Sequence, residues 1–183
     1  VEQPEQLVFI QNVGERRPDG GAPPYPCFER FREQNQFFTG MAAFTGYDPA
    51  IKIDGRLEEV RGQRVSGNYF ELLGIHASLG RTLSPADDPR AGETGPDGLV
   101  AVISHDYWKE RFRADPGVLG QTIQLVDPIT GPREFTIIGV AAAEFPGFEQ
   151  SAPKLWIPTA MHDHFRKSQL LNFRLIGRLR PGL

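Results

Sequence analysis

Residues 65–75 read VSGNYFELLGI and contain the signals that decide the local fold around them. The apolar Val65 ends an extended segment, Asn68 and Glu71 have the spacing of a capping box, and Gly74 follows the last leucine. A capping box begins a helix, and a glycine in the left-handed conformation ends one. This stretch therefore predicts a strand, a short capped helix and a glycine stop in succession.

Extended segments lie on both sides of this stretch. Residues 50–53 and 57–65 flank Asp54-Gly55, which favours the type I′ turn of a hairpin. A second hairpin is predicted from residues 121–126 and 135–141 around a long loop, residues 127–133. The remaining predicted strands are residues 7–10, 99–103 and 172–180.

Alternation predicts which strand faces are buried. Ile123 and Leu125 alternate with polar neighbours, so one face of that strand is expected in the core. In the last strand the apolar side chains face one way and the arginines the other; they are Phe173, Leu175 and Leu179 against Arg174, Arg178 and Arg180.

Two further helices are predicted, and both are short. Pro26 fits the first turn of a helix in which Phe28, Phe31 and Phe38 recur near helical spacing. Ser104 can cap a helix over residues 105–113, with Trp108 and Phe112 on one face. Strands dominate and hairpins recur, so the predicted fold class is α+β, with strand-rich mixed sheets and a few short helices.

Length and composition limit the function classes. The chain has 183 residues, a formal charge of −3 and one cysteine, Cys27. This length fits one domain or one domain with two lobes, and the cysteine excludes an internal disulfide. The near-neutral charge without a basic run gives no support for a nucleic-acid partner. The longest charge-free stretch, residues 34–47, is shorter than the roughly 20 apolar residues of a membrane helix.

Two histidine motifs are candidates for chemistry. His162-Asp163-His164 could hold a metal or act in hydrolysis, but two ligands without an obvious third favour a solvated polar turn. Ser104-His105-Asp106 contains the letters of a catalytic triad. Neighbours in sequence cannot form that relay, so helix capping explains them better.

Acidic residues are the other candidates. Asp87, Asp88, Glu93 and Asp97 do not have calcium-loop spacing, and residues 84–87 (SPAD) predict a capped single turn. Asp48 with Glu58 or Glu59 would be a carboxylate pair only if the fold brings them together. No phosphate-binding glycine loop or nucleophile elbow is present. The residues alone predict no catalytic, cofactor-binding or metal residue and no cofactor.

An ordered set of segments resembles a known family. After residues 65–75 come LGRT at 79–82, VAVISHDYW at 100–108, RF at 111–112 before DP at 115–116, LGQTI at 119–123 and FTIIGV at 135–140. YPxF at 25–28, FxGxAA at 38–43 and RLRPG at 178–182 extend the match over nearly the whole chain. This order and spacing resemble the periplasmic core domain of MacB-type ABC exporter permeases, in the FtsX-like superfamily.

The resemblance implies a non-enzymatic domain on the periplasmic face of the bacterial inner membrane, between two transmembrane helices of a permease. Such a domain couples ATP hydrolysis elsewhere to export of drugs, peptides or lipoproteins. The implied partners are the rest of the permease and a cytoplasmic ATPase, with a second permease copy, a periplasmic adaptor and an outer-membrane channel as further ones.

The resemblance also implies two lobes, a β-rich lobe of residues 46–171 inserted into a lobe of residues 1–45 plus 172–183. Family domains continue beyond residue 182, so residues 1–183 are expected to lack the C-terminal part. The loops at 91–98 and 127–133 look longer than the family pattern, and surface loops are the simpler interpretation. Two other hypotheses stay open: a periplasmic or secreted hydrolase using His162 and His164, and a stand-alone binding module.

Overall fold

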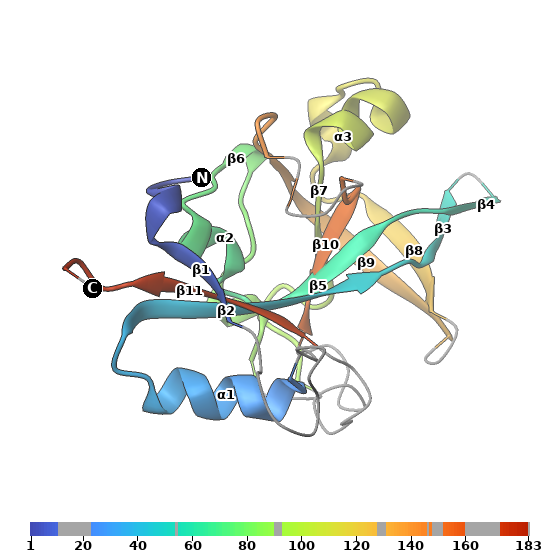
Figure 1. The fold of residues 1–183 in the computed structure, drawn as a ribbon. Coiled ribbons are helices and arrows are strands. Elements are labelled where there is room, and N and C mark those ends of the chain that lie inside the picture. The colour runs from blue at the N-terminus through green and yellow to red at the C-terminus, as the bar shows by residue number, and fades with distance from the viewer. Residues whose placement is uncertain are drawn as a thin grey trace.

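Backbone pairing joins the described strands into one large, strongly twisted sheet (Figure 1). The computed structural model describes residues 1–10, 23–53, 55–89, 93–127, 131–145, 147, 152–159 and 173–182. The strands are β1 (Leu7–Ile10), β2 (Phe38–Tyr47), β3 (Ala50–Ile53), β4 (Arg56–Glu59), β5 (Gly62–Val65), β6 (Ala77–Gly80), β7 (Val100–Ile103), β8 (Thr122–Asp127), β9 (Gly131–Ala141), β10 (Leu155–Pro158) and β11 (Arg174–Leu179). The helices are α1 (Tyr25–Gln34), α2 (Tyr69–Leu73) and α3 (His105–Phe112), with 3₁₀ turns η1 (Pro4–Gln6), η2 (Pro85–Asp87) and η3 (Pro116–Val118).

The sheet is mixed, as predicted for an α+β chain. Its strand order is β1-β11-β2-β5-β10-β7-β9-β8-β3-β4, with β6 paired to β9 outside this path. Two neighbouring pairs, β5 with β10 and β7 with β9, are parallel. The other described pairs are antiparallel. The predicted fold class is therefore confirmed.

Both predicted turns form, but one loop is shorter than expected, and the prediction of a single strand over residues 57–65 is wrong. That segment divides into β4, which pairs with β3, and β5, which pairs with β2 and β10. Gly55 has φ +76 between β3 and β4, as the predicted tight turn requires. Between β8 and β9, Asp127 pairs with Gly131 and Val126 with Pro132. The prediction of a long loop over residues 127–133 is thus wrong. Proline has no backbone N–H but keeps its carbonyl oxygen. Pro132 can therefore lie in the β8–β9 ladder at a position where no N–H needs to donate to the partner strand.

Helix α2 ends as predicted but begins differently. Gly74 has φ +64, and its N–H donates to Glu71 O and Phe70 O. The predicted capping box is wrong, because Asn68 makes no cap hydrogen bond. Its Nδ2 donates to Met41 O at 2.8 Å, and its Oδ1 accepts from Ser66 Oγ at 2.9 Å. Met41 of β2 and Ser66, just after β5, thus take the place of the local cap.

The other two helices also form near their predicted places. Helix α1 stops at Asn35, whose Oδ1 accepts from Phe38 N at 2.8 Å. Phe38 therefore begins β2, and the helical interpretation of its spacing is wrong. Ser104 caps α3 by accepting from Tyr107 N at 3.1 Å, as predicted. Trp108 and Phe112 both pack against the main core.

Two hydrophobic cores lie on opposite faces of β2 and β11. Met41, Ala43 and Leu175 belong to the smaller core, which Tyr25, Phe28 and Phe173 complete on the side of the sheet where α1 lies (Figure 1). Alternate residues of the same strands, Ala42, Phe44 and Ile176, belong to the main core. The alternation predicted for Phe173 and Leu175 is confirmed, and Ile176 buries the other face as well. Among the described residues, no helix has the length and apolar character needed to cross a membrane.

Candidate functional site

The enzymatic candidates that lie within the described residues are not brought together into one site. Residues 162–164, with both motif histidines, lie outside the described residues. Ser104, His105 and Asp106 lie at the start of α3, where Ser104 serves as its cap. His105 Nδ1 is 3.9 Å from Asp106 Oδ1, which is too long for a hydrogen bond in a relay. Within the described ranges, no group of three or more His, Cys, Asp or Glu residues is placed to hold a metal.

Of the carboxylates at positions 48, 58 and 59, Glu58 is held by partners from α3. Glu58 accepts from Tyr107 Oη at 2.8 Å and lies 3.7 Å from Arg111 Nε. Burial, followed by the neighbouring Glu58, raises the pKa of Tyr107, so the phenol stays protonated and donates a hydrogen bond to the carboxylate. Glu58 and Glu59 are consecutive in β4 and therefore point to opposite faces. Asp48 follows β2.

The acidic loop contains an arginine-centred network. Arg81 donates to Asp87 through Nη1 at 2.7 Å and Nη2 at 2.8 Å, and its Nη2 also pairs with Asp97. Ser84 contributes its backbone N–H and hydroxyl to Asp87, which confirms the predicted capped turn. Burial of Asp87 acts to raise its pKa, but the hydrogen bonds from Arg81 and Ser84 outweigh it, and the pKa is lowered. The network is thus a structural clasp for the loop after β6.

A second polar cluster joins α1 to the sheet. Asp88 accepts from Tyr25 Oη at 3.2 Å and from Gly67 N at 3.0 Å. Thr159 Oγ1 lies 2.9 Å from Asp88 Oδ1 and 2.9 Å from Tyr25 Oη. These contacts bring the start of α1, the segment before α2 and the end of β10 to one carboxylate. Asp87 and Asp88 therefore have different partners, and each stabilises the fold.

A buried ion pair connects two parts of the sheet. Arg64 Nη2, from β5, lies 2.6 Å from Asp127 Oδ2 at the end of β8. The Arg64 guanidinium also stacks on the Tyr47 ring, 3.9 Å from its centroid. Burial, opposed by the charge of Arg64, raises the pKa of Tyr47 to about 12. The sequence interpretation missed this group; an arginine within the strand of residues 57–65 was the available signal.

The two ends of the chain meet in a cluster that we call the end clamp: Arg178, Glu2, Gln3 and Leu72. Strands β1 and β11 are antiparallel neighbours, with Leu7 opposite Arg178. Arg178 donates to Leu72 O through Nη2 at 2.7 Å and Nε at 3.1 Å. It also donates to Glu2 O at 2.8 Å and Gln3 O at 3.2 Å. One guanidinium thus holds the N-terminal segment, the C-terminal strand and the end of α2 together.

Two glycines make room for this arrangement. At Gly74 a Cβ would overlap the side chain of Glu2, whose N–H donates to Leu73 O at 3.0 Å. At Gly177 a Cβ would come within 2.6 Å of the Phe38 ring. Close packing at the chain ends therefore depends on these residues lacking a side chain.

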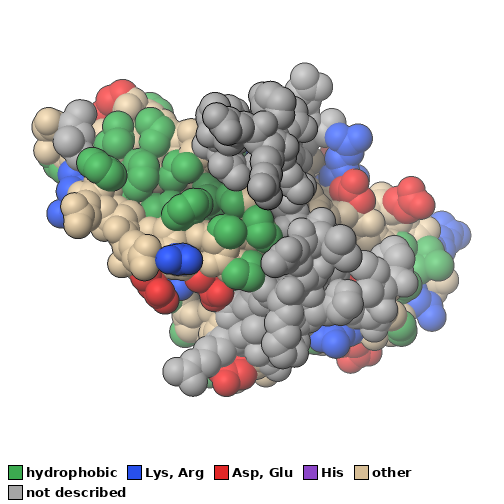
Figure 2. All heavy atoms as spheres, turned by 60° about the horizontal axis from the view of Figure 1, so that its bottom comes forward, with side chains coloured by type: hydrophobic (Ala, Val, Ile, Leu, Met, Phe, Trp, Pro, Cys, Tyr) green, Lys and Arg blue, Asp and Glu red, His purple; other side chains and the backbone are tan. Residues whose placement is uncertain are grey.

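An apolar surface lies next to the smaller core. Phe31 and Phe37 are exposed by 48% and 62%, and with Ile10, Phe38 and Met41 they line a shallow pocket of about 340 Å³. Figure 2 shows hydrophobic side chains gathered on this face, over α1 and the start of β2. Contiguous exposed apolar surface of this kind is typical of interaction sites.

The sequence model of one protein family, the MacB-like periplasmic core domain, matches residues 1–182. The chain belongs to the MacB-like periplasmic core domain family. It is a periplasmic or extracellular domain of a membrane ABC transporter permease, and the family is a permease-domain family and not an enzyme family. No curated protein sequence gives a significant match.

Three solved structures share the fold of this chain. The periplasmic region of MacB from Actinobacillus actinomycetemcomitans matches with a TM-score of 0.66 at 14% identity, over 100% of this chain and 80% of that one. A domain of a permease protein from Porphyromonas gingivalis gives 0.61 at 18% identity, covering 89% and 70%. The extracellular domain of the ABC-type transporter YknZ from Gram-positive bacteria gives 0.62 at 12% identity, covering 96% and 83%. The predicted family and the extracytoplasmic location are thus confirmed.

Proposed function

We propose that this MacB-like domain transmits conformational change between the membrane part of its transporter and the extracytoplasmic face. The observation that carries the proposal is the end clamp. Both chain ends lie toward the same side of the molecule (Figure 1), and Arg178 links them to α2 and thereby to the main core. A displacement of either end reaches α2, and through it the main core, by way of this guanidinium.

The packing around the clamp supports a mechanical role. Strand β11 lies between β1 and β2, so both ends belong to one hydrogen-bonded ladder. Strands and helices that are closely packed and hydrogen-bonded transmit a displacement over a longer distance than loops without such contacts. The two faces of this ladder are covered by different cores. We therefore expect a pull on the ends to shift the cores against each other.

We also propose two lobes for this movement, residues 1–45 plus 172–183 and residues 46–171. The smaller core supports this division, because its members come from residues 25–43 and 173–175. The part-buried hydrogen bond from Tyr25 to Asp88 crosses the proposed boundary and limits how far the lobes separate.

We further propose that ATP hydrolysis in a cytoplasmic domain or subunit drives this movement, and that the exported cargo is a drug, peptide or lipoprotein. The rest of the permease is the direct partner, followed by a second permease copy, a periplasmic adaptor and an outer-membrane channel. The apolar surface around Phe31 and Phe37 suits such protein contacts.

Hydrogen exchange on the whole transporter tests this function. The permease is reconstituted with its ATPase in lipid nanodiscs and compared with and without a non-hydrolysable ATP analogue. We expect altered exchange at residues 1–3, at residues 72–74 and in β2. In Arg178→Ala the change at residues 1–3 should remain while the change at residues 72–74 is weakened, because the guanidinium reaches Leu72 and the backbone ladder to β2 stays intact. Arg180→Ala, an exposed neighbour in sequence, is the matched control. Identical exchange with and without nucleotide throughout this domain would disprove the proposal.

A further inference from the structure

The sheet beside the smaller core contains one β-α-β unit and the first strand of another. Strands β1 and β2 each pair antiparallel with β11, which lies between them, so β1 and β2 run parallel. Parallel strands need a crossover connection, and α1 lies between β1 and β2 in the chain and on one face of these strands (Figure 1). Within the described residues, no helix follows β11.

The handedness of such crossovers decides where a helix after β11 would lie. Crossovers between parallel strands are right-handed in nearly all proteins. Strand β11 runs opposite to β1, and the unoccupied side of this part of the described sheet lies beyond β1, because β2 already pairs with β5. Reversing both the strand direction and the sideways step keeps the helix on the same face. A second unit would therefore place its helix next to α1, as in the split β-α-β arrangement of ferredoxin-like folds.

Helix α1 covers only part of that face. Phe31 on the helix is 48% exposed and Phe37, just before β2, is 62% exposed. Both line the shallow pocket next to the smaller core, where Gln34 and Asn35 are the polar members of the described lining. Figure 2 shows the hydrophobic side chains gathered on this face. An uncharged lining of this kind suits the apolar stripe of an amphipathic helix.

The chain leaves β11 beside the same surface. Leu179 pairs with Phe38, and Arg180 N donates to Phe37 O at 3.0 Å. A helix that begins a few residues later starts next to Phe37 and can run back along α1 past Phe31. About 15 Å of helix matches the ten residues of α1. The chain then reaches β1, whose four residues are uncharged and do not oppose pairing.

We propose that the permease polypeptide after residue 183 supplies an amphipathic helix that packs on the apolar surface beside α1, followed by a strand that pairs with β1. The three solved structures agree with this, because each has residues outside its match with this chain. The proposal takes from the proposed function only that the rest of the permease is the direct partner. It holds whether or not the domain transmits movement.

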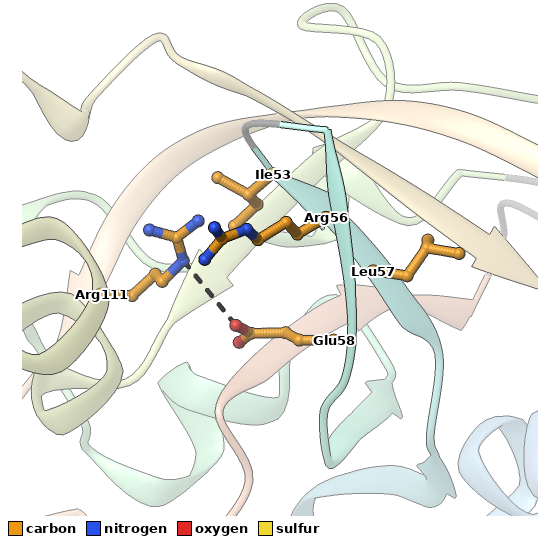
Figure 3. A pocket seen from close by; sticks show the side chains of 5 residues that line it. All are labelled: Ile53, Arg56, Leu57, Glu58 and Arg111. Carbon is orange, nitrogen blue, oxygen red and sulfur yellow. Dashed lines mark ion pairs between the residues drawn. The ribbon is translucent and has the colours of Figure 1, made fainter.

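Photo-crosslinking in the whole permease tests what covers the apolar surface. The photoreactive residue p-benzoylphenylalanine replaces Phe37, and in a matched sample it replaces Leu57. Leu57 is 64% exposed, as Phe37 nearly is, and points away from Arg56 and Glu58 on β4 (Figure 3). Under ultraviolet light and without nucleotide, position 37 should form adducts within one chain to residues after position 183. Position 57 should form none to that segment.

Other adducts would contradict the proposal. A product of doubled mass on a gel would show that a second copy covers the surface, and adducts to lipid or to a different protein would show those occupants. The absence of any adduct at position 37 would show that the surface stays uncovered. Because no nucleotide is added, these results do not depend on whether nucleotide changes hydrogen exchange in the domain.

Hydrogen exchange on the same permease tests the added strand. Strands β1 and β4 stand at the two ends of the strand order of the described residues, so β4 is the matched control. Pairing protects backbone amides, and peptides spanning β1 should exchange about tenfold more slowly than peptides spanning β4. Equal exchange in the two strands would show that no strand pairs with β1 and would overturn that part of the proposal.

Discussion

Arg178 and Leu72 are 106 positions apart in sequence, yet two hydrogen bonds from one guanidinium reach the same carbonyl oxygen at 2.7 and 3.1 Å. The orphan carbonyls at the end of a helix need donors, and α2 receives this one from β11. Because the same side chain also holds Glu2 and Gln3, the end of a five-residue helix is linked to both ends of the chain.

Removing this guanidinium should loosen three segments together. Arg178→Ala is expected to lower the free energy of unfolding by about 2 kcal/mol, because several carbonyls lose a charged donor. Chemical denaturation measures the loss. Arg180→Ala, with its exposed side chain, should change stability by less than about 0.5 kcal/mol. Equal losses in both variants would show that the clamp contributes nothing specific.

Gly74→Ala should destabilise the domain for two separable reasons. Its φ of +64 disfavours any Cβ, and here the Cβ would also overlap Glu2. Gly98→Ala is the matched control, because Gly98 has φ +75 and open space around it. The control should cost about 1 kcal/mol from backbone strain, and Gly74→Ala about 2 kcal/mol or more. Thermal unfolding of both variants gives the difference, which reports the contact with the N-terminal segment.

The Arg81–Asp87 clasp predicts a pH dependence. Because the pKa of Asp87 is lower in the folded chain than its ordinary value of 3.8, the carboxylate stabilises the fold above that value. This contribution is lost as the pH falls below 3.8 through the lowered pKa. Asp87→Asn should therefore be less stable than the parent at pH 7, and the difference should shrink as the pH falls below 3.8. Denaturation curves across this range check it, and a pH-independent difference would contradict the prediction.

The buried Arg64–Asp127 pair should respond differently to one and to two substitutions. Arg64→Met leaves the Asp127 carboxylate buried without its counter-ion and should cost about 3 kcal/mol. Combining it with Asp127→Leu removes the unpaired charge, so most of that loss should be recovered. The denaturation midpoints of single and double variants test this. A double variant less stable than Arg64→Met would mean that the pair itself contributes the stability.

Strand β4 stands last in the strand order of the described residues, and this position predicts alternating amide exchange along it. The backbone groups of Leu57 and Glu59 should exchange hydrogen quickly, while those of Arg56 and Glu58, bonded to β3, should be protected. Amide exchange followed by NMR checks this alternation. Uniform protection along β4 would show that its outer edge is already covered.

Local chemistry alone determined much of this fold. Gly74 ends α2 because a left-handed residue favours glycine, Ser104 caps α3 because its hydroxyl accepts a free helical N–H, and Gly55 closes the β3–β4 turn. Each of these depends on neighbours within a few positions, so sequence spacing was sufficient. The strand alternation of Ile123 and Leu125 is local in the same sense.

Tertiary structure decided the groups whose partners are far away in sequence. Asn68 had cap spacing but donates to Met41 in β2, and Phe38 had helical spacing but pairs with Leu179 of β11. Asp87 and Asp88 are adjacent yet bind Arg81 on one side and Tyr25 on the other. The end clamp exists because sheet order places β11 between β1 and β2. The periodicity of a strand's sequence shows which of its faces is apolar. Which other strand it pairs with depends on free energies summed over the whole sheet.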